Sequence, residues 1–277
     1  MSTGAPLIDV WNIATFDTEL RGDLDAHAEL IRDFFLTAAR MLLAPEAPNH
    51  AMPYPQNPHA DEFMWVTEHT MRLMAERTIR AWHYTRMTDN EVGALRRNGI
   101  YLSTLDTIRR RFADQVAEGA FDQDIANQLF ADSSFQGNQR DSRSNKFWMT
   151  SHPIGIEDDS VEPLLNSWGG ESTYFRQRDP NLQALLTRIG RPRVLELVMP
   201  LVHSHHGYPA AEAVIATYGR TLRCRPDRRT FDLYTHQPLG PEHVLAVHSQ
   251  GDDSLSALAR GYPREYVELG FAAESDE

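Results

Sequence analysis

The stretch IRAWHYTR at residues 79–86 is rich in aromatic and β-branched side chains, which predicts a β-strand. It is followed by Thr88-Asp89-Asn90-Glu91, in which Thr88 and Glu91 have the spacing of a capping box at the start of a helix. Asn98-Gly99 is typical of a helix C-terminus, so this helix is expected to end there. A strand that leads directly into a short capped helix indicates a fold that mixes both kinds of element.

The same mixture continues toward the C-terminus. The run RVLELVMPLV at residues 193–202 is the clearest buried strand of the sequence. Shorter strands are predicted at residues 100–104 (a strand or an edge), 146–151, 231–236 and 244–248. Helices are predicted at residues 105–117, 161–167, 181–189 and 210–218. We therefore expect an α+β fold with a mixed or antiparallel sheet.

The N-terminal part has a purely helical pattern. Apolar residues recur at helical spacing over residues 20–43 and 61–77, and either Asp23 or Asp25 is a candidate N-cap for the first helix. Prolines between residues 45 and 58 predict an extended arm or linker. We expect an N-terminal helical layer with its arm at residues 1–58 and an α+β catalytic domain at residues 59–277, packed together as one structural unit.

Composition limits the classes of function. The 277 residues include 41% hydrophobic and 24% charged side chains, as in ordinary globular proteins, and no apolar run reaches the roughly 18–20 residues of a membrane helix. The N-terminus has no signal-peptide pattern, and the one cysteine, Cys224, excludes an internal disulfide, so a cytoplasmic location without a membrane is expected. A net charge of -12 argues against tight non-specific binding of nucleic acid.

Two places in the sequence have residues suited to chemistry. On a strand, His83 and Thr85 face the same side, where an imidazole and a hydroxyl can hydrogen-bond a ribose or an amide. In Trp168-Gly169-Gly170-Glu171, two glycines permit close backbone approach between an indole and a carboxylate that we expect to be poorly solvated. The alternatives are a hydrogen-bonded core histidine and a solvent-exposed acid on a turn.

The segment from residue 82 to residue 86, the capped helix that ends at Asn98-Gly99 and then Tyr101 together resemble the opening of ADP-ribosyltransferases. This family includes diphtheria-toxin-like, poly-ADP-ribose-polymerase-like and DNA-modifying toxin branches. The resemblance implies a split sheet of the ADP-ribosyltransferase type and NAD as the substrate. It also implies that His83, assisted by Thr85, holds the adenosine ribose or the nicotinamide amide, and that Tyr101 stacks on nicotinamide.

The resemblance further implies that Glu171 is the catalytic acid, while Trp168 and Tyr174 wall the pocket. Nicotinamide would leave from the ribose, and the carboxylate would stabilise the oxocarbenium-like transition state. Glu196, in the buried run, is a competing candidate for this role. The acceptor of ADP-ribose, whether a macromolecule, a small molecule or water, is not named by the sequence, and a role as a toxin or defence effector fits the family.

Another branch of the family uses an arginine, then Ser-Thr-Ser, then a Glu-x-Glu pair. Arg80 or Arg86 followed by Thr150-Ser151 matches half of that order, but the sequence has no Glu-x-Glu. The polar residues 132–145 predict a mobile loop, which is a candidate place for acceptor recognition.

Two alternatives belong to other classes of protein. His203 and His205 would share one face if the strand continued to them, which suggests a metal-dependent hydrolase, but no carboxylate stands at a ligand spacing, so we predict no metal site. The N-terminal helices and the acidic charge also suit a non-enzymatic interaction or immunity protein.

Cys224 lies between two arginines, which would lower the pKa of its thiol, yet without a base beside it we expect it to be unreactive.

Overall fold

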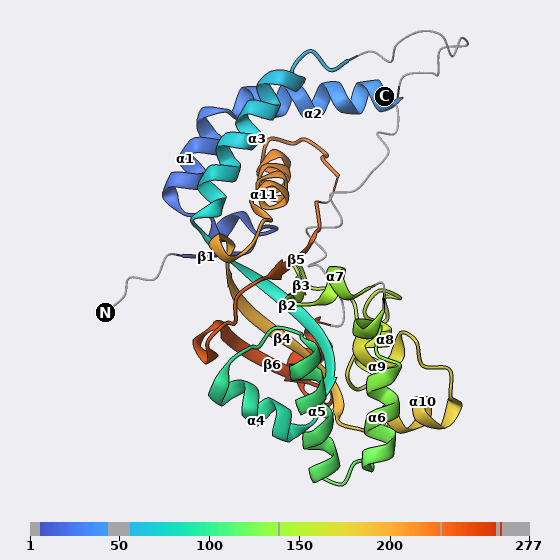
Figure 1. The fold of residues 1–277 in the computed structure, drawn as a ribbon. Coiled ribbons are helices and arrows are strands. Elements are labelled where there is room, and N and C mark those ends of the chain that lie inside the picture. Colours follow the sequence, from blue (N-terminus) through green and yellow to red (C-terminus); the bar gives the residue numbers. More distant parts are fainter. Residues whose placement is uncertain (1–5, 44–55, 138, 228, 259–260, 262–277) are drawn as a thin grey trace, which may run out of the picture. The chain divides into compact units, whose positions relative to one another are not determined.

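The structure is a computed structural model and describes residues 6–43, 56–137, 139–227, 229–258 and 261 of the chain. Most of the proline-rich run predicted as an arm lies outside the described residues. The rest contains runs of helices together with a sheet whose neighbouring strands pair mainly antiparallel, which confirms the α+β class (Figure 1). The described residues divide into two compact units, one made from Met1–Ile79 and Pro200–Phe231, the other from Arg80–Met199 and Asp232–Tyr262.

The first unit is mainly helical. Its helices are α1 (Thr18–Ala26), α2 (Ala28–Leu43), α3 (Ala60–Ala75) and α11 (Gly207–Thr221), with a short strand β1 (Leu7–Ile8) and the 3-10 turns η1 (Ile13–Thr15) and η3 (Leu201–His203). Helix α11 packs against α2 and α3 and is buried along most of its length. The unit thus joins the two N-terminal helices to segments that the sequence prediction placed in the catalytic domain.

The single helix predicted at residues 20–43 is wrong. The chain leaves helical geometry at His27, whose N–H bonds the carbonyl of Leu24 three residues back, a tighter contact that ends α1. Asp17, rather than Asp23 or Asp25, caps α1 by accepting a hydrogen bond from the Leu20 N–H at 2.8 Å. The helix predicted at residues 61–77 is confirmed as α3.

The second unit is built around a sheet. Its strands are β2 (Thr78–Met87), β3 (Phe147–Thr150), β4 (Arg191–Pro200), β5 (Asp232–Thr235) and β6 (Val244–Ser249), in the order β5-β3-β2-β4-β6. Neighbouring pairs β2–β3, β3–β5 and β4–β6 are antiparallel, and β1 runs parallel to the first two residues of β2. The expected mixed sheet is therefore present, as one sheet rather than two halves.

The strand predicted at residues 100–104 is wrong. Only isolated bridges form there, from Ile100 to Leu239 and from Ser103 to Lys146. Too few residues run alongside a partner to continue the ladder, so this segment is a connection between two helices. It nevertheless holds Tyr101 at a fixed point beside the sheet.

Helices complete the second unit. They are α4 (Asp89–Asn98), α5 (Leu105–Ala117), α6 (Gln123–Ala131), α7 (Arg140–Arg143), α8 (Glu162–Asn166), α9 (Glu171–Tyr174), α10 (Pro180–Leu186) and α12 (Asp253–Leu258), with the 3-10 turns η2 (Ser134–Gln136) and η4 (Pro241–His243). Helices α6 and α12 were not predicted, and the loop expected at residues 132–145 contains η2 and α7. None of the helices in the described ranges combines the length and the apolar content needed to cross a membrane.

A helical core lies within the second unit. Buried side chains of α5, α6, η2 and α10 pack around Trp168, which is fully buried. The predicted capping box is present at α4, because Thr88 accepts from the Glu91 N–H and Glu91 accepts from the Thr88 N–H. Glu91 is thereby fixed in a position from which its carboxylate reaches the helical core.

Candidate active site

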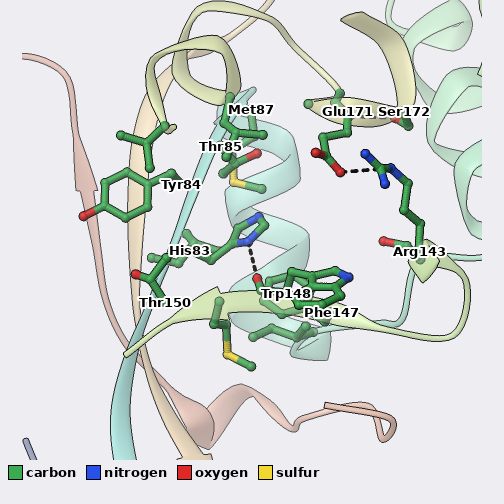
Figure 2. A pocket seen from close by; sticks show the side chains of 18 of the residues that line it. His83, Tyr84, Thr85, Met87, Arg143, Phe147, Trp148, Thr150, Glu171 and Ser172 are labelled. Carbon is green, nitrogen blue, oxygen red and sulfur yellow. Dashed lines mark hydrogen bonds and ion pairs between the residues drawn. The ribbon is translucent and has the colours of Figure 1, made fainter. Parts of the chain in front are cut away.

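A cavity of about 460 Å³ opens in the second unit, between β2, β3, α5, α7 and the turn that begins α9 (Figure 2). Its walls combine polar and aromatic side chains from segments far apart in the sequence. The lining includes the following residues with polar or charged groups: His83, Thr85, Tyr101, Arg111, Arg143 and Glu171. The cavity volume lies in the range of small-molecule and cofactor sites.

His83 is half-buried on β2 and its ring lies 4.3 Å from the Phe147 ring, centroid to centroid. Its Nδ1 is 2.8 Å from the carbonyl oxygen of Trp148 (Figure 2). Since a carbonyl can only accept, Nδ1 carries the proton and Nε2 is left as an acceptor. Desolvation at the base of the cavity lowers the pKa of His83 to about 4, so the imidazole is neutral at pH 7.

Glu171 is the first residue of α9 and lines the same cavity. Its carboxylate forms an ion pair with Arg143, 3.0 Å from Oε2 to Nε (Figure 2). The side chain is 41% exposed, so the expectation of a poorly solvated carboxylate beside an indole is wrong. The polar loop supplies its partner, because Arg143 belongs to α7.

Two glycines position Glu171. Gly169 has φ 85° and Gly170 has φ 55°, backbone values that residues with a side chain rarely adopt. A Cβ on Gly169 would also lie 2.5 Å from Cγ2 of Thr173. Thr173 closes the turn by donating its hydroxyl to the Trp168 carbonyl at 2.5 Å. The positive φ values that the Gly-Gly pair permits are therefore present, with the Thr173 side chain packed against Gly169, and Glu171 follows this turn in the cavity lining.

Tyr101 lines the cavity from the connection between α4 and α5, with 51% of its surface exposed. Trp148, on β3, lines it with 39% exposed. Exposed aromatic rings at the rim of a cavity can stack on a planar group. Thr85 also lines the cavity from β2, two residues beyond His83.

The structure does not bring Trp168 into the cavity lining. Its ring is fully buried in the helical core, and its Nε1–H donates to Oε2 of Glu91 at 2.9 Å. Tyr174 is likewise absent from the described lining, although it lies close enough to Glu171 for burial and the Glu171 charge to raise its pKa. Trp168 therefore anchors the turn in the helical core, through its ring and through its carbonyl bond to Thr173, and neither residue lines the cavity.

Glu196 lies outside the lining as well. Its neighbour Leu195 faces the cavity, and successive side chains on a strand point to opposite faces. Glu196 accepts from His248 Nε2 at 2.9 Å and pairs with Arg80, and these contacts, the His248 bond first, lower its pKa despite burial. The structure therefore places Glu171, and not Glu196, in the lining of the cavity that His83 also lines.

The arginine-based pattern is not assembled at the cavity. Arg86 donates to the carbonyls of Ile189 at 2.9 Å and Gly190 at 3.0 Å, and Arg80 pairs with Glu196. Of the residues that half-matched this branch, Thr150 lines the cavity, whereas Ser151 is buried.

Sequence reasoning missed the two cavity arginines. Arg143 is in the polar segment that was predicted as a loop, where nothing in the local pattern marks one arginine among several. Arg111 is on α5 and lies over the Trp168 ring, a contact between segments separated by more than fifty residues. Neither has a sequence signal of its own.

His203 and His205 do not lie on a strand. Strand β4 ends at Pro200 and His203 closes the turn η3, so the strand does not continue to His203 and His205, and the condition for a shared face is not met. Within the described ranges, no group of three His, Cys, Asp or Glu side chains is placed to hold a metal ion.

Cys224 is buried, and desolvation raises the pKa of its thiol, opposite to the lowering expected from its arginine neighbours.

Comparisons of the chain with models of known protein families, with curated proteins and with solved structures found no match.

Proposed function

We propose that the second unit is an NAD-consuming enzyme of the ADP-ribosyltransferase type, with Glu171 as the catalytic residue and an unidentified acceptor. The observation that carries the proposal is the convergence of His83, Thr85, Tyr101 and Glu171 on one cavity. Each of these four residues has a distinct proposed role in binding or cleaving NAD. They come from three separate segments of the chain, so their meeting in one place is not a consequence of closeness in sequence.

In the proposed reaction the bond between C1′ of the ribose and the nicotinamide nitrogen breaks, and its electron pair leaves with nicotinamide. The ribose becomes oxocarbenium-like, and the Glu171 carboxylate stabilises this positive charge electrostatically. A nucleophile, either water or a group on the acceptor, then bonds to C1′ and loses its proton to the carboxylate or to solvent. Arg143 holds the Glu171 carboxylate at the cavity wall between turnovers.

The remaining lining residues bind NAD in this proposal. Neutral His83 offers Nε2 as an acceptor for a ribose hydroxyl or for the amide N–H of nicotinamide, and Thr85 adds a hydroxyl on the same strand face. Tyr101 supplies the stacking surface for nicotinamide. We assign acceptor recognition to the segment that carries Arg143, because this segment borders the cavity next to Glu171, and a role as a toxin or defence effector belongs to the same proposal.

The test is nicotinamide released from NAD, measured by chromatography on the purified protein. We expect slow release by the wild type, and a loss of roughly a hundredfold or more in Glu171→Gln with the NAD dissociation constant changed by less than about threefold. The matched control is Glu196→Gln, which alters a partly buried carboxylate on the other sheet face. The proposal fails if the wild type neither binds nor cleaves NAD, and the site assignment fails if Glu196→Gln, rather than Glu171→Gln, abolishes release.

A further inference from the structure

Arg111 is a cation in the cavity wall to which the proposed reaction assigns no role. Its side chain is 18% exposed and lines the cavity from α5. The guanidinium carbon lies 4.7 Å from the centroid of the Trp168 ring, so one face of the group rests on an indole. Its Nε donates to Oε1 of Glu91 at 2.5 Å, and one terminal nitrogen, Nη2, reaches the Arg86 carbonyl at 3.5 Å.

The other terminal nitrogen, Nη1, has no hydrogen-bond partner among the described residues. The Glu91 carboxylate accepts from three donors, the Thr88 N–H, the Trp168 Nε1–H and Nε of Arg111, and its contact with Arg111 is made through Nε alone. The guanidinium rests on an indole with one face and bonds this carboxylate through Nε, so its Nη1 donors are left for a ligand.

The rest of the cavity contributes little competing positive charge. Arg143, the other arginine in the described lining, is engaged with Glu171. The charge of Arg111 is felt at His83, where it adds to desolvation in lowering the histidine pKa and so keeps that side chain neutral. Of the two arginines in the described lining, Arg111 is thus the one without an acidic residue of the cavity lining as its partner.

We propose that Arg111 is a substrate-binding residue that receives the phosphate groups of a nucleotide through its free guanidinium edge. This inference rests on the proposed function, in which the nucleotide is NAD and the phosphates are its diphosphate. A guanidinium edge matches the geometry of phosphate oxygens, and hydrogen bonds between two charged partners are stronger than neutral ones. Thr107, one turn earlier on α5, also lines the cavity, but its hydroxyl bonds the Leu102 carbonyl at 3.0 Å, so the assignment rests on Arg111.

The competing interpretation is structural, because Arg111 and Glu91 also tie α5 to α4. The test therefore compares Glu91→Gln with the double variant Glu91→Gln/Arg111→Gln, which removes both charges and leaves no buried carboxylate without its partner. Calorimetry would measure the binding of ADP, adenosine and inorganic pyrophosphate to the full chain. Adenosine lacks phosphate, so it reports a general disturbance of the cavity.

We expect Glu91→Gln to bind ADP as the wild type does or more tightly. We expect the double variant to bind ADP roughly ten- to a hundredfold more weakly, with adenosine changed by less than about twofold. Equal losses for ADP and adenosine, a loss already complete in Glu91→Gln, or no binding of ADP and pyrophosphate by the wild type would each overturn the assignment. Binding of pyrophosphate that depends on Arg111, without nicotinamide release from NAD, would support Arg111 as a phosphate site while contradicting the proposed reaction.

Discussion

Individual side chains around the cavity differ in what burial does to them. Desolvation keeps His83 neutral, which preserves an acceptor at Nε2. Burial of Trp168 instead requires a partner for its N–H, and Glu91 provides it. His83 thus keeps a free acceptor for a ligand, whereas Trp168 is buried in the core with its N–H bonded to Glu91.

The low pKa of His83 predicts a specific dependence of stability on pH. The folded pKa is about 4 and the ordinary value is 6.5, so between these values the unfolded chain binds a proton that the folded chain does not. Stability contributed by neutral His83 is complete above pH 6.5 and is lost as the pH falls toward 4. Urea unfolding over this range should show that wild type loses more stability than His83→Gln. Parallel pH curves for the two proteins would contradict the assignment, and the exposed His205→Gln serves as the control.

Trp168→Phe should lower the free energy of unfolding by about 1–3 kcal/mol, because it leaves the Glu91 carboxylate without one of its donors. Chemical denaturation would measure this change in the free energy of unfolding. Trp65→Phe is the matched control, since Trp65 is 53% exposed and the same change there should stay within roughly 0.5 kcal/mol. Equal effects at the two positions would show that Trp168 is not the support described for the turn.

At the scale of elements, the turn between α8 and α9 decides where Glu171 points. Gly170 combines φ 55° with ψ -143°, a conformation that a side chain makes costly. The turn is short, and its hydroxyl bonds from Ser172 and Thr173 return to the carbonyls of Gly169 and Trp168. A change in its backbone therefore moves the proposed catalytic carboxylate directly.

Gly170→Ala should lower nicotinamide release by roughly tenfold or more, because a displaced carboxylate no longer meets the ribose. Gly119→Ala is the matched control: Gly119 also has positive φ, 76°, but lies at the end of α5 outside the described cavity lining. Both variants should lose about 1–3 kcal/mol of stability. If Gly119→Ala lowers release as much as Gly170→Ala, strain alone explains the loss and the turn has no positioning role.

Elements with strong local signals could be predicted from sequence. Strand β2, the capping box of α4 and strand β4 follow from β-branched runs and from the Thr88–Glu91 spacing. The sequence did not predict that α1 ends at His27, or that residues 100–104 form isolated bridges and no strand. Each outcome depends on contacts that the periodicity of apolar residues does not encode. In the cavity, His83 and Thr85 share a strand face, whereas the Arg143–Glu171 pair joins residues whose approach depends on the tertiary fold.

For the whole molecule, the cavity can be assigned to one of the two compact units. All described residues that line the cavity belong to the second unit. The chain as a whole carries a net charge of -12, which acts against polyanionic partners over distances of about a Debye length.

This charge predicts that the protein does not retain duplex DNA non-specifically at physiological salt. Electrophoretic mobility shift with a random-sequence duplex should show no complex at micromolar protein. A complex that weakens steeply as salt rises would reveal a basic surface strong enough to overcome the net charge, and would make duplex nucleic acid a candidate acceptor.

The central claim is that NAD occupies the cavity of the second unit. Hydrogen–deuterium exchange of Glu171→Gln with and without NAD tests it most directly, because this variant should hold NAD without consuming it. We predict slower exchange at residues 83–87, 101–107 and 142–150, with the helices α1, α2 and α3 unchanged. Protection that is absent from these three segments, or confined to the first unit, would contradict the account.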